Sequence, residues 1–214
     1  AESKEDCYIL AKIEGIVNYL VLLRHGESQW NKENRFTGFT DVDLNETGIA
    51  EAKRAGQALQ AIKFDKIYTS TLKRAYRTAE LALAEMGQNP PTIKHDDLRE
   101  RDYGDLTGLN KDETRKKFGE EQVHIWRRSF DVRPPGGESL KDVVARVTPY
   151  YEAHILPDLK AGKNILLAAH GNTLRSMLII LGQNTPENIH TAEIATGVPV
   201  IFGFEDGQLK GRQP

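Results

Sequence analysis

The chain has 214 residues, 39% of them hydrophobic and 28% charged, and a formal net charge of −2 at pH 7. This length and composition suit a globular domain of ordinary size, and the near-neutral charge argues against a general nucleic-acid binder, which is usually clearly basic. No apolar stretch approaches the roughly 20 residues that a membrane-spanning helix needs, and the lone cysteine, Cys7, excludes an internal disulfide.

Residues 1–18 are mixed and only loosely periodic. Three alternatives stay open for this N-terminal extension: an added helix or edge strand, disorder, or residues foreign to the native protein. The segment is acidic and lacks the layout of a signal peptide, so we expect a cytoplasmic protein. Residues 19–214 contain no linker or repeat, and we expect them to form a single domain.

The first predicted element is a strand over residues 19–23, a short apolar run without polar alternation. This pattern is typical of a strand buried on both faces of a parallel sheet. Arg24, His25 and Gly26 follow the run directly. Because ligands bind at the carboxyl ends of such strands, His25 lies where chemistry is usual, although a single histidine at a strand end is more often structural.

A polar loop over residues 31–43 leads into a helix whose predicted N-cap is Asn45 and whose apolar stripe continues to Leu59. Residues 64–69 predict the next strand. Ser70 or Thr71 is the expected cap of the helix that follows, with Arg74 in its first turn. An arginine at a helix N-terminus favours an anion, since free N–H groups, the dipole and a guanidinium all attract negative charge.

The middle of the chain is rich in turns. Residues 88–92 form a break, and the turn-rich segment 98–108 carries Glu100. Residues 111–126 predict one charged helix, which ends beside Arg127 and Arg128. A loop at 133–138 precedes an amphipathic helix with Ser139 as its expected cap.

A second unit of strand, histidine and glycine lies far downstream. Residues 164–169 predict a buried strand, His170 and Gly171 follow it, and a helix is expected over 173–181. If the two strands are parallel neighbours, both imidazoles leave the sheet at one edge and can face one target. Residues 197–204 predict the last strand, where Pro199 indicates either an edge strand or a strand start.

These residues suit phosphoryl chemistry. A histidine can act as a covalent nucleophile, and arginines can neutralise a phosphoryl group and its transition-state charge. Glu100 is the best-placed proton carrier, although a solvated loop carboxylate is an equal alternative. A basic pair such as Arg127-Arg128 usually lies on a solvated helix face, and this is its ordinary interpretation. The remaining histidines, which have no supporting neighbours, are interpreted as surface or core residues: His95, His124, His154 and His190.

Two other classes of site are disfavoured. No His, Cys or Asp cluster has the spacing of a metal site, and no GxxxxGK[ST] phosphate loop of a nucleotide enzyme occurs.

Several longer runs make the pattern more specific: LVLLRHGESQWNKENRFTGFTDVDL, YTSTLKRA, LRERDYGDLTGLNK, WRRSF, PPGGESL and AAHGNTLR. In order and spacing the chain resembles the cofactor-dependent phosphoglycerate mutases, a branch of the histidine phosphatase superfamily, from about Leu20 to Phe204. The resemblance implies an α/β three-layer sandwich, with a mainly parallel sheet and helices on both faces.

The resemblance also implies roles for individual residues. His25 is the expected phosphohistidine and Glu100 the acid/base on the substrate hydroxyl, while Arg24, Arg74 and His170 complete the catalytic set around the phosphoryl group. The implied substrate-binding residues are Ser28, Asn31, Thr37, Gly38, Arg101, Tyr103, Lys111, Arg127, Arg128, Gly171 and Asn172.

The implied reaction is a phosphoryl relay between 3-phosphoglycerate and 2-phosphoglycerate, primed by 2,3-bisphosphoglycerate and independent of metal. The expected partners are small phosphoglycerates, with neither nucleic acid nor membrane. For His25 to attack, its other ring nitrogen should donate to a fixed acceptor.

Two departures from the family pattern bear on assembly and hydrolysis. The segment between Phe130 and Glu138 resembles the short form of the family, which leaves a homo-oligomer an open question, and little chain follows Phe204 to cover the site. A histidine phosphatase or a bisphosphoglycerate synthase or phosphatase is the main alternative function. A non-catalytic binding module is another, but it would be expected to lack His25, Glu100 or His170.

Overall fold

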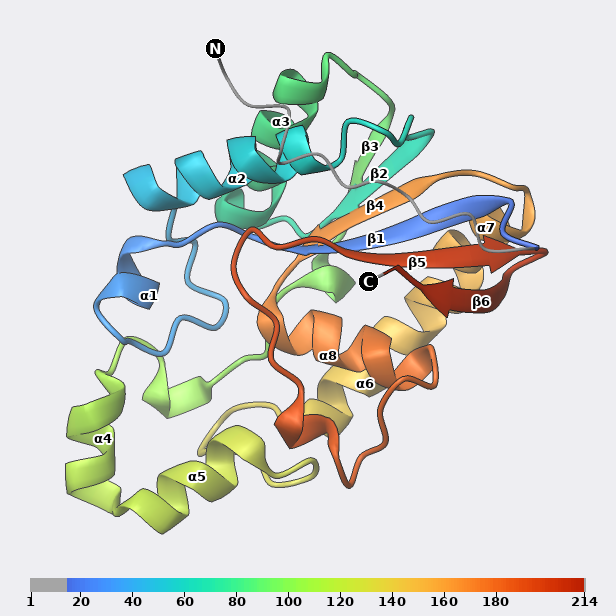
Figure 1. The fold of residues 1–214 in the computed structure, drawn as a ribbon. Helices are drawn as coiled ribbons and strands as arrows, with labels where there is room; N and C mark the ends of the chain where they lie inside the picture. The colour runs from blue at the N-terminus through green and yellow to red at the C-terminus, as the bar shows by residue number, and fades with distance from the viewer. Residues whose placement is uncertain (1–14, 214) are drawn as a thin grey trace.

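The computed structural model describes residues 15–213, in which six strands form one mixed sheet (Figure 1). The strand order is β3-β2-β4-β1-β5-β6. The first four are mutually parallel, whereas β5 and β6 run antiparallel to their neighbours. The strands are β1 (Asn18–Arg24), β2 (Lys66–Thr69), β3 (Thr92–Lys94), β4 (Ile165–Ala169), β5 (Val200–Glu205) and β6 (Gln208–Arg212).

Helices cover both faces of the sheet, which confirms the predicted three-layer α/β sandwich (Figure 1). One face carries α2 (Glu46–Ala58) and α3 (Lys73–Met86), and the other carries α6 (Leu140–Tyr150), α7 (Leu156–Lys160) and α8 (Gly171–Ile180). Three further helices lie beyond one end of the sheet: α1 (Gln29–Lys32), α4 (Lys111–Phe118) and α5 (Glu120–Arg128). Short turns complete the set: η2 (Asp96–Leu98), η3 (Gly104–Leu106), the π-helical η4 (Tyr151–Ile155) and η5 (Ile189–Thr191).

Strand β1 is buried on both faces, as its continuous apolar run predicted. Leu20 and Leu22 pack into the cluster that includes residues of α6 and α8. Val21 and Leu23 pack into the opposite cluster, with residues of α2 and α3. Successive side chains of a strand point to opposite faces, so a strand between two helical layers needs apolar residues at every position.

Two of the predicted helix caps are confirmed and one is wrong. Asn45 accepts a hydrogen bond from the backbone N–H of Gly48 at 2.8 Å, and Ser139 caps α6 through a capping box. Helix α3 instead has Leu72 as its N-cap, without a side-chain bond. Thr71 donates to the carboxylate of Asp96, and Ser70 turns toward another partner.

Other boundaries differ from the predictions for local reasons. The single helix expected over 111–126 is two helices, because Gly119 has a φ of 91° between α4 and α5. Strand β5 lies inside the sheet and begins after Pro199, so Pro199 marks a strand start and not an edge strand. It is not the last strand either, since β6 follows. Helix α1 and strand β3, four and three residues long, had no prediction.

The parallel register brings three chain segments to one edge. Arg24 of β1 pairs with Ala169 of β4, and Thr69 of β2 pairs with Ala168. The residues that follow these strands are His25, Ser70 and His170. The conditional prediction that the two strand–histidine units are parallel neighbours is therefore confirmed.

The N-terminal extension lies mostly outside the described residues, and so do the alternatives raised for it. Asn18, the last residue of the predicted extension, already belongs to β1. Among residues 15–213 no helix is both long enough and apolar enough to cross a membrane.

Backbone of the loop after β1 touches the first turn of α2. A Cβ added at Gly48 would lie 2.1 Å from the carbonyl oxygen of Glu27, and one added at Gly26 would lie 2.2 Å from the carbonyl oxygen of Gly48. This close approach fixes the segment that carries His25 against α2.

We predict that Gly48→Ala lowers the free energy of unfolding by about 1–3 kcal/mol, because two rigid backbone segments must separate to admit the methyl group. Urea unfolding followed by circular dichroism measures the change. The control is Thr47→Ala, an exposed position on the same turn, for which a change within about 0.5 kcal/mol is expected. Equal effects of the two substitutions would contradict the argument.

Candidate active site

Two buried imidazoles face each other at the carboxyl ends of β1 and β4. The ring centroids of His25 and His170 lie 5.1 Å apart with an interplanar angle of 61°. The backbone N–H of His25 donates to the carbonyl of Ala169 at 3.0 Å. The strand pairing therefore continues one residue past β1 and sets the separation of the two rings.

His25 is held as a neutral imidazole with one free nitrogen. Its Nδ1 lies 2.6 Å from the carbonyl oxygen of Gly26, an acceptor only, so Nδ1 carries the proton and Nε2 carries the lone pair. Burial, and then the charges of Arg74 and Arg24, hold the pKa of His25 well below its ordinary value. An uncharged ring with an exposed lone pair is the form that can attack an electrophile.

His170 is also neutral, since burial, and then the charge of Arg74, lower its pKa well below the ordinary value. Its Nε2 lies 2.7 Å from the hydroxyl oxygen of Ser70. Its Nδ1 and the Nε of Arg24 are two of three buried side-chain nitrogen and oxygen atoms without a hydrogen-bond partner among the described residues. Buried polar atoms usually have hydrogen-bond partners, so two unpartnered nitrogens at one site suit the oxygens of an anionic ligand.

Two arginines flank the histidines. Arg24 donates through Nη1 to the carbonyl of Ile194 at 2.9 Å. Arg74, almost fully buried, donates to the carbonyls of Thr40 at 2.7 Å and Gly38 at 2.8 Å. Burial lowers the pKa of Arg74 to about 10, which still leaves it charged at neutral pH. Both guanidinium groups are thus fixed by main-chain oxygens before any ligand arrives.

Glu100 is not a solvated loop carboxylate. Its side chain is buried, and Oε1 accepts hydrogen bonds from the backbone N–H groups of Arg101 at 2.8 Å and Asn172 at 3.2 Å. Within the described residues no hydrogen bond falls on Oε2, which leaves that oxygen to exchange a proton with a ligand.

A pocket of about 170 Å³ lies next to the two histidines, because Arg24 and Gly171, their neighbours in the chain, line it. Six of its lining residues are cationic and one is a carboxylate, so the pocket is built for a ligand with several negative charges. It is lined by Arg24, Asn31, Arg35, Phe36, Thr37, Gly38, Glu100, Tyr103, Lys111, Arg127, Arg128, Gly171, Asn172 and Arg175.

The cations of the pocket shift one another's protonation. Burial and the charges of Arg127, Arg24 and Arg128 lower the pKa of Lys111 to about 8. Burial and Arg128 also lower the pKa of Arg127 and of Arg175. Such mutual repulsion is relieved by an anion, which will therefore bind strongly here.

Helix α8 begins at Gly171, two residues earlier than the predicted 173, because the chain turns into the helix directly after His170. Its first N–H groups consequently lie beside the pocket, where a helix N-terminus favours negative charge. Asn172 also donates through Nδ2 to the hydroxyl of Tyr103 at 3.0 Å.

Two predicted binding residues do not line the pocket. Ser28 is the N-cap of α1, where its hydroxyl and the side chain of Asn31 form a capping box. Asn31 uses Oδ1 for that bond, so its amide N–H₂ is the group left for a ligand. Arg101 is fully buried and donates to the carbonyls of Glu138, Trp126 and Arg127. It therefore ties down the end of α5 that carries Arg127 and Arg128.

Sequence reasoning missed three arginines at the site. Arg35 stacks on Trp30 at 3.9 Å, and Arg175 follows Gly171 by one helical turn. Arg146 donates to the carbonyls of Asp97, Arg99 and Glu100 and pairs with Glu138, so it fixes the backbone that carries Glu100. The one available signal was the i, i+4 spacing of Gly171 and Arg175 on a helix that starts at the site.

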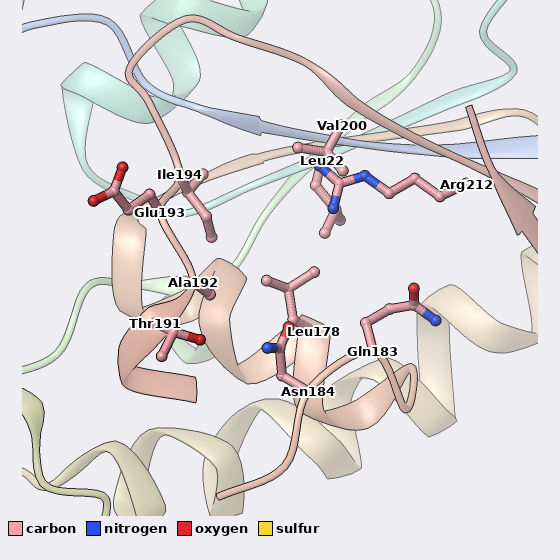
Figure 2. A pocket seen from close by; sticks show the side chains of 10 residues that line it. All are labelled: Leu22, Leu178, Gln183, Asn184, Thr191, Ala192, Glu193, Ile194, Val200 and Arg212. Atoms are coloured by element: carbon pink, nitrogen blue, oxygen red, sulfur yellow. The ribbon is translucent and has the colours of Figure 1, made fainter. Parts of the chain in front are cut away.

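Residues 191–197, here called the strap, bind the side chains of Arg24 and Arg175. The carbonyl of Ala192 accepts from Nε of Arg175 at 3.3 Å and that of Ile194 from Arg24, while the N–H of Gly197 donates to the carbonyl of Arg24. Figure 2 shows the side chains of Ala192 and Ile194 in a second pocket, of about 330 Å³, on the far side of the strap. Backbone carbonyls of the strap therefore bind arginines of the cationic site, whereas the side chains of Ala192 and Ile194 line the second pocket.

No group of three His, Cys, Asp or Glu side chains that could hold a metal ion occurs among residues 15–213.

Comparisons with known proteins agree with this geometry. Residues 20–212 match the family model described as "Histidine phosphatase superfamily (branch 1)". The chain is 58% identical over 186 residues to a protein of Bradyrhizobium diazoefficiens named 2,3-bisphosphoglycerate-dependent phosphoglycerate mutase, which covers 86% of this chain and 90% of that protein. A Methylobacterium protein of the same name is 57% identical over 86% of this chain and 89% of its own length.

Among solved structures, the chain is similar to a mycobacterial glucosyl-3-phosphoglycerate phosphatase in complex with VO3. The TM-score is 0.77 and the sequence identity 27%, over 87% of this chain and 92% of that one.

We predict that the buried histidines make stability depend on pH. Both have lowered pKa values in the folded state and ordinary values near 6.5 when unfolded, so the unfolded chain binds more protons as pH falls below 6.5. The free energy of unfolding should then fall by up to about 1.4 kcal/mol per pH unit for each histidine.

Urea unfolding between pH 7.5 and 5 measures this slope. The variant His25→Gln/His170→Gln should show a shallower slope, whereas His124→Gln, on the outer surface of α5, should keep that of the unsubstituted chain. Identical slopes in all three proteins would refute the argument.

Proposed function

The chain belongs to the histidine phosphatase superfamily, branch 1, and we propose that it is a 2,3-bisphosphoglycerate-dependent phosphoglycerate mutase. It interconverts 3-phosphoglycerate and 2-phosphoglycerate in glycolysis and gluconeogenesis, and its relatives at 55–58% identity carry the name of this enzyme.

The observation that supports this proposal best is the presence of two groups of cations from different parts of the fold at one site. Arg24 and Arg74 lie close to the histidines, whereas Lys111, Arg127 and Arg128 come from α4 and α5 and line the pocket together with Arg24. A simple phosphomonoesterase needs only the first group. A bisphosphate, or a phosphate with a carboxylate, needs both.

The proposed reaction uses His25 as nucleophile. Phosphorylated on Nε2, His25 gives its phosphoryl group to the 2-hydroxyl of 3-phosphoglycerate, which forms 2,3-bisphosphoglycerate. Nε2 then takes the 3-phosphoryl group of that intermediate, which leaves 2-phosphoglycerate and restores the phosphoenzyme, while Nδ1–H stays bonded to the carbonyl of Gly26. Arg24, Arg74 and the Nδ1 of His170 neutralise the phosphoryl oxygens. The backbone and side chain of Asn172, Gly171, Asn31, Thr37 and Gly38 complete the binding surface.

Glu100 is the proposed acid/base. Its Oε2 accepts the proton of the attacking hydroxyl in one half of the reaction and returns it in the other. The two backbone N–H groups on Oε1 hold the carboxylate in place during both steps.

The remaining parts of the proposal concern the cofactor, the partners and the subcellular location. 2,3-Bisphosphoglycerate primes the phosphoenzyme, no metal takes part, and the enzyme works in the cytoplasm on small phosphoglycerates. Ser28 and Arg101 act by positioning: Ser28 orients Asn31, and Arg101 anchors α5.

A second candidate is a phosphatase of the same superfamily. The solved mycobacterial relative bears a phosphatase name, and the catalytic histidine chemistry would be shared. In that case water, not the glycerate hydroxyl, would receive the phosphoryl group of His25.

We predict that the protein converts 3-phosphoglycerate to 2-phosphoglycerate in the presence of EDTA, with a rate that depends on catalytic 2,3-bisphosphoglycerate and with little release of inorganic phosphate. ³¹P NMR of quenched samples resolves 3-phosphoglycerate, 2-phosphoglycerate and inorganic phosphate, and so measures both products without a metal-dependent coupling enzyme. His25→Ala should remove conversion, and Lys116→Ala, exposed on α4, should leave it unchanged. Phosphate release without isomerisation would support the phosphatase instead.

We also predict that 3-phosphoglycerate binds less tightly as pH rises through about 8, since the free enzyme then loses the charge of Lys111. Above this pKa the dissociation constant should rise by up to about tenfold per pH unit. Titration calorimetry between pH 7 and 9 measures the trend. Lys111→Arg keeps its charge and should flatten it, whereas Lys116→Arg should not. The idea fails if all three proteins share one pH dependence.

A further inference from the structure

Ser70 contacts His170, and the proposed reaction gives Ser70 no role. It follows β2 directly and is fully buried. Its hydroxyl oxygen lies 2.7 Å from Nε2 of His170, on the neighbouring parallel strand's end. This is a side-chain bond between the two strand ends that meet beside His25.

The hydrogen-bond partners of Ser70 fix where its proton goes. A serine hydroxyl has one proton and two lone pairs. The backbone N–H of Leu72 donates to the Ser70 oxygen at 3.2 Å. Among the described residues the one acceptor within reach of the hydroxyl proton is Nε2 of His170. When Ser70 donates there, its hydroxyl proton has an acceptor and its oxygen accepts from Leu72.

The direction of the hydrogen bond from Ser70 to Nε2 of His170 determines the tautomer of His170. A neutral imidazole has one N–H and one lone pair, so an Nε2 that accepts from Ser70 leaves the proton on Nδ1. Nδ1 is the buried ring nitrogen that lacks a protein partner. In the opposite tautomer Nδ1 would present a lone pair to the phosphoryl oxygens, and the proton of Ser70 would have no acceptor.

We propose that Ser70 is a positioning residue of phosphoryl transfer, which holds His170 in the Nδ1–H tautomer so that this N–H donates to the phosphoryl group on or beside His25. The kinetic consequence rests on the proposed mutase reaction. The tautomer itself does not.

The arrangement gives the second histidine a fixed function without a charge. Arg24 and Arg74 supply positive charge close by, and a cationic His170 among them would be costly. A neutral ring contributes only a directed N–H, which is useful only if the proton is on the correct nitrogen. Ser70 is the group that makes this selection.

The first test is spectroscopic. In protein with ¹⁵N-labelled histidine, two-bond ¹H–¹⁵N correlation spectra distinguish the Nδ1–H and Nε2–H tautomers, and comparison with His170→Asn assigns the signal. We expect Nδ1–H in the unsubstituted protein and in Thr71→Ala, which removes the half-buried neighbouring hydroxyl that bonds to Asp96 and not to His170. In Ser70→Ala we expect a mixture or the Nε2–H form. An Nε2–H form in the unsubstituted protein overturns the proposal, whatever the activity.

The second test is kinetic. Ser70→Ala should lower kcat by about 10- to 100-fold, the size of loss found when a group that orients a ligating histidine is removed, with little change in KM. Ser70→Thr, which keeps the hydroxyl, should restore most of the rate. In a His170→Asn background, Ser70→Ala should have no further effect, since Ser70 acts through that ring. Additive losses in the double variant would overturn the proposal.

The two tests separate the possible failures. If the unsubstituted protein shows phosphatase but not mutase activity, the proposed function fails. The tautomer and the non-additivity can then still be measured on phosphate release. If mutase activity is present but Ser70→Ala retains both tautomer and rate, only the role of Ser70 fails.

Discussion

The parallel pairing of β1 with β4 is the constraint on which the rest of the site depends. The register Arg24–Ala169 and the further bond from the His25 N–H to the Ala169 carbonyl place the two imidazoles 5.1 Å apart. Neither ring could be brought there by its own sequence neighbours, because about 145 residues separate them. The buried apolar run of each strand excludes other registers, since a shift by one residue would exchange the two helical layers of the core.

The second constraint is electrostatic. Six cationic side chains line a pocket that holds a single carboxylate, and burial together with the neighbouring positive charges lowers the pKa values of Lys111, Arg127 and Arg175. Main-chain carbonyls make this arrangement tolerable: Arg24, Arg74, Arg101 and Arg175 each donate to at least one. Each guanidinium is thereby fixed in direction but not neutralised, so its charge stays available for a ligand. Preorganisation of this kind costs stability in the free protein and lowers the reorganisation needed on binding.

Much of the fold could be predicted from local signals, because each signal acts over a few residues. The apolar runs before His25 and His170, the caps Asn45 and Ser139 and the apolar helix stripes all had local physical causes. The predictions that were wrong concern features set by backbone angles or by distant residues. Gly119 divides the expected helix through its positive φ, and Ser70 bonds to a histidine 100 residues away instead of capping α3. Arg101 and Arg175 illustrate the same limit at the site. Arg101 directly follows Glu100, and Arg175 lies four residues after Gly171. Arg101 donates to carbonyls inside the protein, whereas Arg175 lines the pocket.

The two groups of cations belong to different structural elements, which bears on how a mutase and a phosphatase can share one fold. His25, the proposed nucleophile, lies at the sheet edge with His170 and Arg24, and Arg74 belongs to α3. Lys111 belongs to α4, and Arg127 and Arg128 belong to α5, which packs through Val123 and Trp126 into a small separate cluster with Phe36, Leu106 and Tyr103. Phe118 of α4 contacts Trp126, with ring centroids 5.2 Å apart. A change within that cluster can move the second group of charges while leaving the strand register, and with it the chemistry at His25, intact. The fold therefore allows substrate size to vary independently of the phosphoryl-transfer step, and the α4–α5 unit is where the acceptor of the phosphoryl group would be selected.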